Sequence, residues 1–347
     1  MASRHRAIWV SGYQLASEKM GKAAVKTGPR AWSNPYRHPH RLVVFLAGLT
    51  VLLLVAGGLV TSNLAGDSVP DWPMSFGRWV LGSRQFVGNV RYEYSHRVIA
   101  GSVSCVTLLM ALWVWTSQKL RQFRGLALAA LVGVLFQAGL GGIRVLFPGQ
   151  KIPIAMVHAL IAQSFFCLIV TLAVVTSSSW NQNRQLKPDD SALPLRPLSA
   201  LTVGAILIQL LLGAGFRHGA LGIGWHIGGA SVVSGLVIFT ALRVWRNHRA
   251  DRYLRGPAVL MCFLLICQVG LGIGSYLARL ASVDDPQPLE PMVSLTVAHV
   301  VVGALTLAAT LVLALRCNQI LAGGRVLSME SGTRHPESGE WRSEYSL

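Results

Sequence analysis

Four histidines interrupt stretches of sequence that are otherwise apolar. His96 and His226 are 130 residues apart, and His158 and His299 are 141 residues apart. Imidazole is a common axial ligand of heme iron, and two imidazoles on different helices of a bundle can bind one iron from opposite faces. We therefore predict two bis-histidine heme sites, one formed by His96 with His158 and the other by His226 with His299.

Two alternatives to heme binding have to be weighed for these histidines. A single histidine in an apolar helix is more often a hydrogen-bonded packing residue, although ionisable groups inside membranes are often functional. A zinc site would need three or four ligands close together, and each pair offers two. The residue four positions after each histidine is small, which leaves room for a flat macrocycle, although tight helix packing alone also accounts for it. These residues are Ala100, Ala162, Ala230 and Gly303.

One carboxylate distinguishes the two histidine pairs. Glu93 lies three residues before His96, whereas the equivalent position before His226 is Ile223. Glu93 could act as a catalytic base or proton relay, or it could orient the histidine. The alternative is that it only forms an ion pair with a neighbouring arginine.

Basic residues near the ends of the apolar stretches form a second candidate set. Arg97, Arg144 and Arg217 could bind the propionate groups of a heme, because guanidinium pairs well with carboxylates. Charges that simply mark the ends of helices are the equal alternative. We do not expect His218 to be an axial ligand, because it has no repeat equivalent.

The elements that carry these residues are apolar and long. Only 13% of the 347 residues are charged, and the mean hydropathy is +0.49. A bilayer is spanned by roughly 20 apolar residues, and eight uncharged stretches are long enough. They are residues 42–65, 98–118, 125–143, 152–183, 197–216, 218–242, 256–278 and 291–315. The predicted fold class is therefore an all-α polytopic membrane protein with eight transmembrane helices, which excludes a soluble enzyme and an outer-membrane barrel.

The positive charge is distributed unevenly between the loops. Of the 31 lysines and arginines, 23 lie in the two tails and in alternate loops, and eight lie in the remaining connections. The positive-inside rule then predicts that both termini are cytoplasmic, in a bacterial-type plasma membrane or its mitochondrial equivalent. Nucleic-acid binding is the weaker interpretation of the net charge of +17, because no basic run is interleaved with aromatic residues.

The sequence also contains an internal repeat. Gln137-Ala-Gly-Leu-Gly-Gly-Ile matches Gln268-Val-Gly-Leu-Gly-Ile-Gly, 131 residues later, which agrees with the offset between His96 and His226. Each half would hold four helices, so that the fold is two pseudo-symmetric four-helix bundles related by an axis along the membrane normal. The predicted divisions are a basic tail (1–40), a first bundle (41–183), a second bundle (197–316) and a polar tail (317–347).

These residues together resemble the heme A synthase family over roughly residues 40–316. The resemblance rests on Gly57-Gly-Leu-Val-Thr61, Pro70-Asp-Trp-Pro73, the Glu93-x-x-His96-Arg97 element and the single histidines that follow on three later stretches. It implies an oxidoreductase that oxidises the ring methyl of heme O to the formyl group of heme A, by successive hydroxylations, for cytochrome oxidase assembly. It further implies that the first bundle takes the substrate heme and that the second holds a heme b cofactor.

The sequence departs from the family in its first outer loop. Many bacterial relatives carry a cysteine pair there, and this chain has Val69 and Ser75 at those places. It resembles a subtype without these cysteines, so thiol chemistry in that loop is in doubt.

Two other functions remain open from the residues. One is a non-catalytic diheme b electron carrier, and the other is an assembly factor that binds heme without changing it. The asymmetric Glu93 favours the enzyme. An enzyme of this kind would require an electron donor and a supply of heme O, such as a heme O synthase. The electron donor, the source of the inserted oxygen and the formation of a homo-oligomer are not determined by the sequence.

Overall fold

The structure is a computed structural model that describes residues 36–147, 151–182, 186–189, 191, 193–281, 283–284 and 289–322. Within these residues there are eight helices long and apolar enough to cross a membrane, as predicted. They are α2 (Arg37–Ser62), α3 (Val90–Thr116), α4 (Arg124–Leu146), α5 (Lys151–Thr176), α6 (Leu195–Arg217), α7 (Ile223–Asn247), α8 (Arg252–Ala281) and α9 (Glu290–Ile320). Two short 3-10 helices, η1 (Ser83–Gln85) and η2 (Gln118–Phe123), lie between them. The fold class is all-α, and most of the two predicted tails lies outside the described residues.

Several helices are longer than the apolar stretches that predicted them. Helix α2 begins at Arg37, inside the predicted basic tail, and α3 begins at Val90 rather than near 98. Helix α9 continues past 316 to Ile320. Charged side chains are compatible with the ends of membrane helices because their long stems reach toward the polar interface. At these ends the uncharged stretch stops short of the helix, whereas α5 ends at Thr176, before the predicted 183, and α7 begins at Ile223 rather than at 218.

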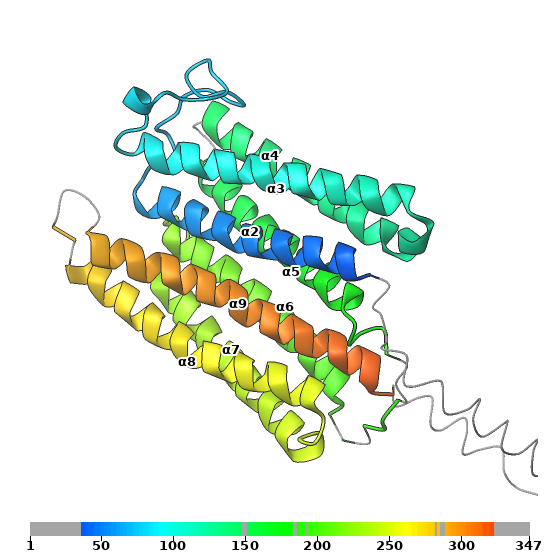
Figure 1. Ribbon diagram of the computed structural model, residues 1–347. Coiled ribbons are helices and arrows are strands. Elements are labelled where there is room, and N and C mark those ends of the chain that lie inside the picture. The colour runs from blue at the N-terminus through cyan, green and yellow to red at the C-terminus, as the bar shows by residue number, and fades with distance from the viewer. Residues whose placement is uncertain are drawn as a thin grey trace, which may run out of the picture.

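The helices pack around two separate cores. One buried cluster draws its residues from α2 to α5 and the connection between α3 and α4, with Leu46, Val103 and Ile169 among its fully buried members. The other draws on α6 to α9, with Met261 and Leu313 at its centre. Figure 1 shows α2–α5 above and α6–α9 below, with the helix axes roughly aligned.

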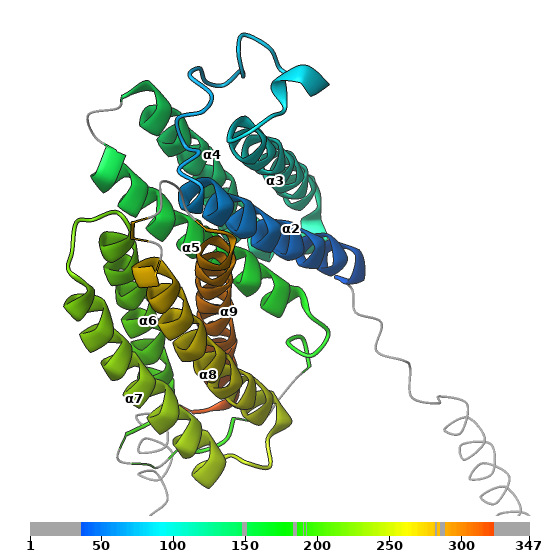
Figure 2. The same cartoon turned by 90° about the vertical axis from the view of Figure 1, so that its left-hand side faces the viewer.

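Four helices form the seam between these two groups. Helix α9 contacts α2 and α5, and α5 also contacts α6. A small third cluster of Leu54, Phe166 and Ala304 fills this seam. Figure 2 shows α5 and α9 side by side between the two groups.

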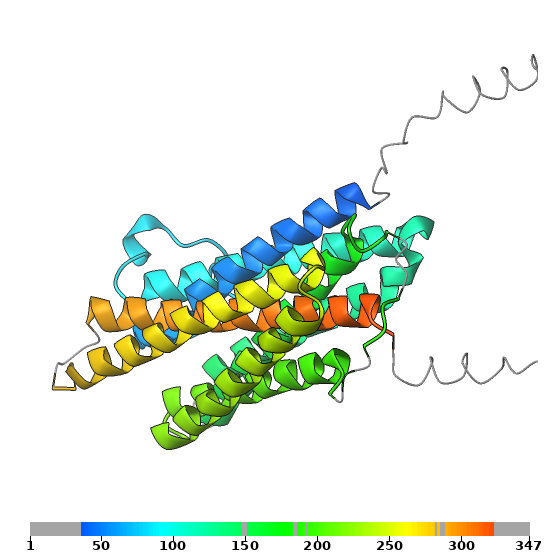
Figure 3. The same cartoon turned by 90° about the horizontal axis from the view of Figure 1, so that it is seen from below.

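The two ends of the molecule differ in what they carry. The connection between α2 and α3 lies at one end, and the start of α2 and the end of α9 both lie at the opposite end (Figure 3). The first end is the one near which all four histidines occur, because α3, α5, α7 and α9 all begin there. We call it the histidine end.

Candidate functional site

Each of the four predicted histidines lies in the first ten residues of its helix. His96 is in α3, His158 in α5, His226 in α7 and His299 in α9. These helices run in the same direction from the histidine end. The structure thus places all four imidazoles toward that end, on four different helices.

A glycine of the preceding helix faces each imidazole. A Cβ added to Gly57 of α2 would lie 3.2 Å from Cε1 of His96, and one added to Gly141 of α4 would lie 3.8 Å from Cε1 of His158. The second half repeats this contact more tightly. A Cβ added to Gly213 of α6 would lie 2.9 Å from Cε1 of His226, and one added to Gly272 of α8 would lie 2.9 Å from Cε1 of His299. Cε1 is the nearest atom in all four cases, so the four imidazoles are seated in the same way.

A glutamine lies one turn before three of these four glycines. Gln137 of α4 donates from Nε2 to the backbone carbonyl of His158 at 2.8 Å. Gln209 of α6 donates to the backbone carbonyl of His226 at 2.8 Å, and its Nε2 lies 3.0 Å from His226 Nδ1. Each of these contacts joins a helix to the one that follows it.

The third glutamine contacts its histidine at both ring nitrogens. His299 Nδ1 lies 3.1 Å from the backbone carbonyl of Gln268, and His299 Nε2 lies 3.2 Å from the side-chain Nε2 of Gln268. A carbonyl can only accept, so Nδ1 carries the proton in this arrangement and Nε2 holds the lone pair that a metal would use. The Gln268 amide must turn away before that nitrogen can bind a metal.

The glutamines were not predicted, although the sequence contained a signal. Gln137, Gln209 and Gln268 each precede a glycine by four residues, and the repeat alignment used only the first and last of them. The small residue Gly303 was predicted to leave space for a macrocycle. The side chain of Gln268 lies beside it instead, because a Cβ on Gly303 would be 3.1 Å from Nε2 of Gln268. The small residue therefore makes room for the glutamine.

The imidazoles of the second half face one another. The ring centres of His226 and His299 are 6.2 Å apart, and the rings are inclined by 76°. Metal–imidazole bonds are about 2 Å long, so two imidazoles on one metal have ring centres roughly 6 Å apart. The separation of the rings thus matches that of two imidazoles on one iron, and the Gln268 amide lies on Nε2 of His299, where such an iron would bind. In the first half, His158 lies close enough to His96 for an electrostatic interaction between the rings, and its buried Nδ1 has no hydrogen-bond partner among the described residues.

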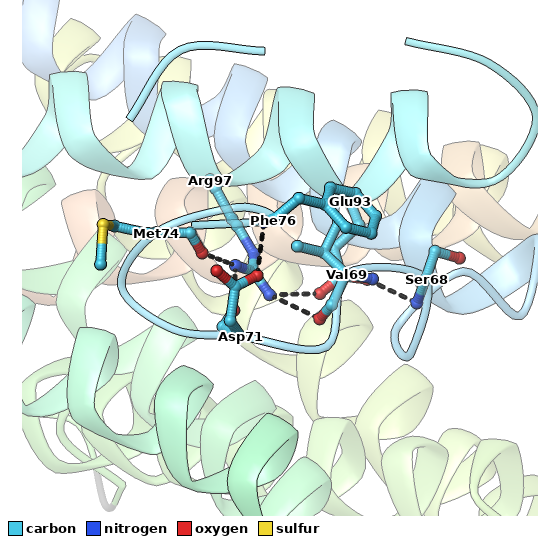
Figure 4. A network of polar contacts seen from close by, with 7 residues as sticks. All are labelled: Ser68, Val69, Asp71, Met74, Phe76, Glu93 and Arg97. Atoms are coloured by element: carbon cyan, nitrogen blue, oxygen red, sulfur yellow. Dashed lines mark hydrogen bonds and ion pairs between the residues drawn. The ribbon is translucent and has the colours of Figure 1, made fainter. Parts of the chain in front are cut away.

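The glutamate beside His96 is buried in a network of polar contacts (Figure 4). Glu93 is 4% exposed. Its Oε2 accepts hydrogen bonds from the backbone N–H groups of Ser68 and Val69, at 2.8 and 2.9 Å, and its Oε1 pairs with Arg97 at 2.7 Å. Both oxygens are therefore engaged with donors. Oε2 accepts two hydrogen bonds and Oε1 accepts one, so one acceptor position is left on Oε1, where Glu93 could take up a proton.

Arg97 extends the same network along the loop. Its guanidinium donates to the backbone carbonyls of Asp71, Met74 and Val69 at 2.6, 2.9 and 3.1 Å. The Glu93–Arg97 pair thus fixes the connection between α2 and α3 onto the start of α3. These contacts occupy Arg97 with the loop rather than with a free surface for a propionate.

Asp71 holds the tip of that loop. Its two carboxylate oxygens accept hydrogen bonds from the N–H groups of Phe76 and Gly77, at 2.6 and 2.7 Å. Burial alone would raise the pKa of Asp71, but these two hydrogen bonds and the charge of Arg97 lower it below its usual value. The adjacent Trp72 packs on α4, where a Cβ on Gly142 would lie 2.7 Å from its ring.

The other two predicted arginines lie near the seam between the halves. Arg217 donates from Nη2 to the carbonyl of Gly58 at 3.1 Å and to Oγ of Ser62 at 2.6 Å, so α6 is tied to α2. Arg144 lies against Gly66, whose added Cβ would be 2.8 Å from Arg144 Nη2.

His218 follows the last residue of α6 and lies close to both of these arginines. Burial, together with the charges of Arg144 and Arg217, lowers the pKa of His218 to about 4. It is therefore neutral at physiological pH.

The architecture and the site together define a class: a multi-pass helical membrane protein with single histidines on four of its helices. A family model described as cytochrome oxidase assembly protein matches residues 40–225. The chain belongs to this family. The matched region includes the Glu93–Arg97 network and the first two of the four histidines, and it ends just before His226.

Individual relatives agree with this assignment. The chain is similar to proteins named heme A synthase from Alkalihalophilus pseudofirmus, at 31% identity over 36% of this chain and 42% of the relative, and from Halalkalibacterium halodurans, at 29% identity over 44% and 51%. A heme A synthase from Exiguobacterium sp. is 24% identical over 67% of this chain and 83% of the relative. The chain spans about half the length of the first two relatives in these matches.

Proposed function

We propose that this protein is a heme A synthase, an oxidoreductase that converts heme O to heme A for cytochrome oxidase assembly. The facing pair of His226 and His299, with ring centres 6.2 Å apart, is the observation that carries the proposal in the structure. Membership of the cytochrome oxidase assembly protein family and the names of the similar proteins support the activity. In this reaction the ring methyl would be oxidised to the formyl group by successive hydroxylations, a net oxidation that requires an external oxidant as well as the electron donor.

The two halves of the protein would bind different hemes. We assign a heme b cofactor to His226 and His299, because their ring centres have the separation that one iron between them requires and Gln209 contacts the ring of His226 at Nδ1. When bound, heme b would supply one-electron redox chemistry. We assign the iron of heme O to His96 and His158, because among the four candidate ligands only His96 has a carboxylate three residues before it, Glu93.

The remaining residues would position the substrate and handle protons. Glu93 is the proposed catalytic group of the first half, and the loop that it holds would cover the histidine end there. Arg144 and Arg217 are proposed to bind heme propionates near the seam. For Arg97 the contacts with the loop carbonyls favour a role in holding the loop.

The proposed function also implies a cellular location and functional partners. We infer a plasma membrane location with both termini in the cytoplasm, in agreement with the distribution of basic residues. An electron donor and a heme O synthase would be the functional partners.

Mass spectrometry of extracted hemes tests the activity. The protein would be expressed with an enzyme that makes heme O, in a host that lacks heme A. Heme A or its hydroxylated intermediate is the expected product. Bound heme b with unchanged heme O would instead support the electron carrier or the assembly factor.

A pair of variants tests the division between the halves. His226→Ala should lower the amount of heme b bound to the purified protein much more than His96→Ala does. Equal losses in the two variants would contradict the assignment of heme b to the second half.

A further inference from the structure

The connection between α2 and α3 carries a group of exposed apolar side chains beyond the part that Glu93 and Arg97 hold. Trp79 is 71% exposed and Val80 is 76% exposed, and Phe86 and Val87 are exposed as well. They lie in residues 78–87, which include the short helix η1 and which we call the arm. Exposed apolar side chains gathered in one connection mark a contact with another molecule or with a membrane.

The arm is attached to the start of α3 through Tyr94. The backbone N–H of Leu81 donates to Tyr94 Oη at 3.2 Å, and the rings of Phe86 and Tyr94 meet edge to face with their centres 6.2 Å apart. Glu93, which holds the earlier part of the same connection, precedes Tyr94 and lies about 100° away from it around the helix. The connection therefore wraps around the start of α3, from the buried face at Glu93 to the face that carries Tyr94.

Tyr94 stands at the top of the exposed face of α3. The residues 4, 11, 15 and 18 positions later lie on the same face, and all of them are exposed: Val98, Cys105, Leu109 and Leu112. Because α3 is long and apolar enough to cross a membrane, this face meets lipid. Figures 1 and 2 both show the short helix η1 outside α3, beyond the outline of the eight long helices. The arm thus lies over the lipid that borders α3.

The charge of this part of the chain is suited to anionic lipid. From residue 72 to residue 92 the sequence contains three arginines and no acidic residue. Two of these arginines, Arg78 and Arg84, lie in the arm and are exposed. Tryptophan is typical of the headgroup layer of a membrane, and guanidinium pairs well with phosphate. The combination favours a phospholipid surface over a purely apolar partner.

We propose that the arm docks on the membrane surface at the histidine end. Trp79 and Val80 enter the headgroup layer, and Arg78 and Arg84 bind the phosphate groups of anionic phospholipids. The inference goes beyond the proposed function and does not depend on it, because it uses only the arm and the lipid-facing side of α3. The protein holds one part of the connection through Glu93, and the lipid would hold the part that the protein leaves exposed.

A spin label at position 80 tests the location of the arm. Val80→Cys would be made in a full-length chain whose five native cysteines are replaced by alanine, and the labelled protein would be placed in nanodiscs that contain phosphatidylglycerol. Power saturation with oxygen and with a water-soluble nickel chelate reports the depth of the label. Labels at Leu109, on the exposed face of α3, and at Asp284, in the connection between α8 and α9, give the references for lipid and water. The oxygen-to-nickel accessibility ratio at Val80 should be several times that at Asp284.

The two arginines and the lipid charge test the recognition of phosphate. An arginine near an anionic surface favours the bound state about fivefold, so Arg78→Gln with Arg84→Gln should lower the ratio of docked to undocked arm about 30-fold. Nanodiscs of phosphatidylcholine alone should shift the unsubstituted arm in the same direction. Arg246→Gln with Arg249→Gln is the matched control, because it removes the same charge from exposed positions after α7 begins to end, away from the histidine end. It should leave the label at Val80 unchanged.

The apolar contact is tested by removing the exposed tryptophan of the arm. Trp79→Ser should raise the nickel accessibility of the label at Val80, whereas Trp225→Ser, at a tryptophan that is 68% exposed in the first turn of α7, should not. Equal circular dichroism spectra would show that the variants keep their helices.

Two results would overturn the inference. If the label at Val80 is as accessible to nickel as the label at Asp284 in both lipid compositions, the arm lies in water and docking is wrong. Its apolar side chains would then be available to a partner protein. If the label at Val80 lies in lipid but responds neither to phosphatidylglycerol nor to the two arginine substitutions, the recognition of phosphate is wrong.

Discussion

Replacement of Glu93 by alanine should release the loop between α2 and α3. The variant removes the acceptor of two backbone N–H groups, those of Ser68 and Val69, and the ion-pair partner of Arg97. Arg97 keeps three backbone carbonyls as acceptors, so its charge remains solvated by the protein. The loss is therefore dominated by the two N–H groups.

The size of the effect can be worked out from those two hydrogen bonds. A hydrogen bond to a charged group contributes about 1.5 to 3 kcal/mol. Ser68 is half-buried, so water can replace part of the hydrogen-bond energy that its N–H group loses. Val69 is fully buried, so water can replace less of that energy there. We therefore expect a local loss of roughly 3 kcal/mol, which corresponds to an increase of about 100-fold in the open population.

Amide hydrogen exchange measures this opening directly. In Glu93→Ala, the amides of Ser68 and Val69 should exchange about 100-fold faster than in the wild type. Glu290→Ala is a matched control, because Glu290 also lies in the first turn of a helix but is exposed. Unchanged exchange at Ser68 and Val69 in Glu93→Ala would refute the role of the carboxylate in holding the loop.

Replacement of Glu93 by glutamine distinguishes the role of Glu93 in holding the loop from its proposed role in proton transfer. Both backbone N–H groups donate to one carboxylate oxygen, so the amide oxygen of Glu93→Gln can accept both. This variant keeps those two hydrogen bonds but turns an NH2 group toward Arg97, which must then rely on its three loop carbonyls, and it cannot take up a proton as a carboxylate does. We expect it to bind heme b normally and to make no heme A. Normal product from Glu93→Gln would show that Glu93 acts only on the loop.

Two further predictions concern the packing and the charge near the histidines. Gly272→Ala should weaken heme b binding, because its Cβ would lie 2.9 Å from Cε1 of His299. Gly270→Ala is the control on the same helix, because a Cβ there has nothing within 4 Å, and it should bind heme b as the wild type does. Heme titration measures both variants. The second prediction concerns His218, whose pKa of about 4 in the folded protein is below the usual 6.5. Because the unfolded chain then binds a proton that the folded chain does not, stability should fall as the pH is lowered from 6.5 to 4, and His218→Gln should reduce the fall in melting temperature over that range. A wild type and a His218→Gln variant with equal pH dependence would contradict it.

The sequence alone determined the class of the protein and the position of its four histidines along their helices. Uncharged stretches of about 20 residues are typical of membrane helices, because lipid cannot satisfy backbone polar groups. The spacing of the histidines along those stretches then places each imidazole near a helix end. The start of α3 and the end of α9 were missed, since charged residues at the interface continue a helix beyond its apolar part.

Only the tertiary structure decided which side chains meet. Gln209 and His226 are 17 residues apart and lie on different helices, and the repeat alignment offered no reason to pair them. The sequence placed Glu93 beside His96 on one helix face, but its contacts with Ser68 and Val69 depend on how the loop folds back over α3. Helical periodicity acts within one element, whereas these contacts depend on how neighbouring helices and loops pack together.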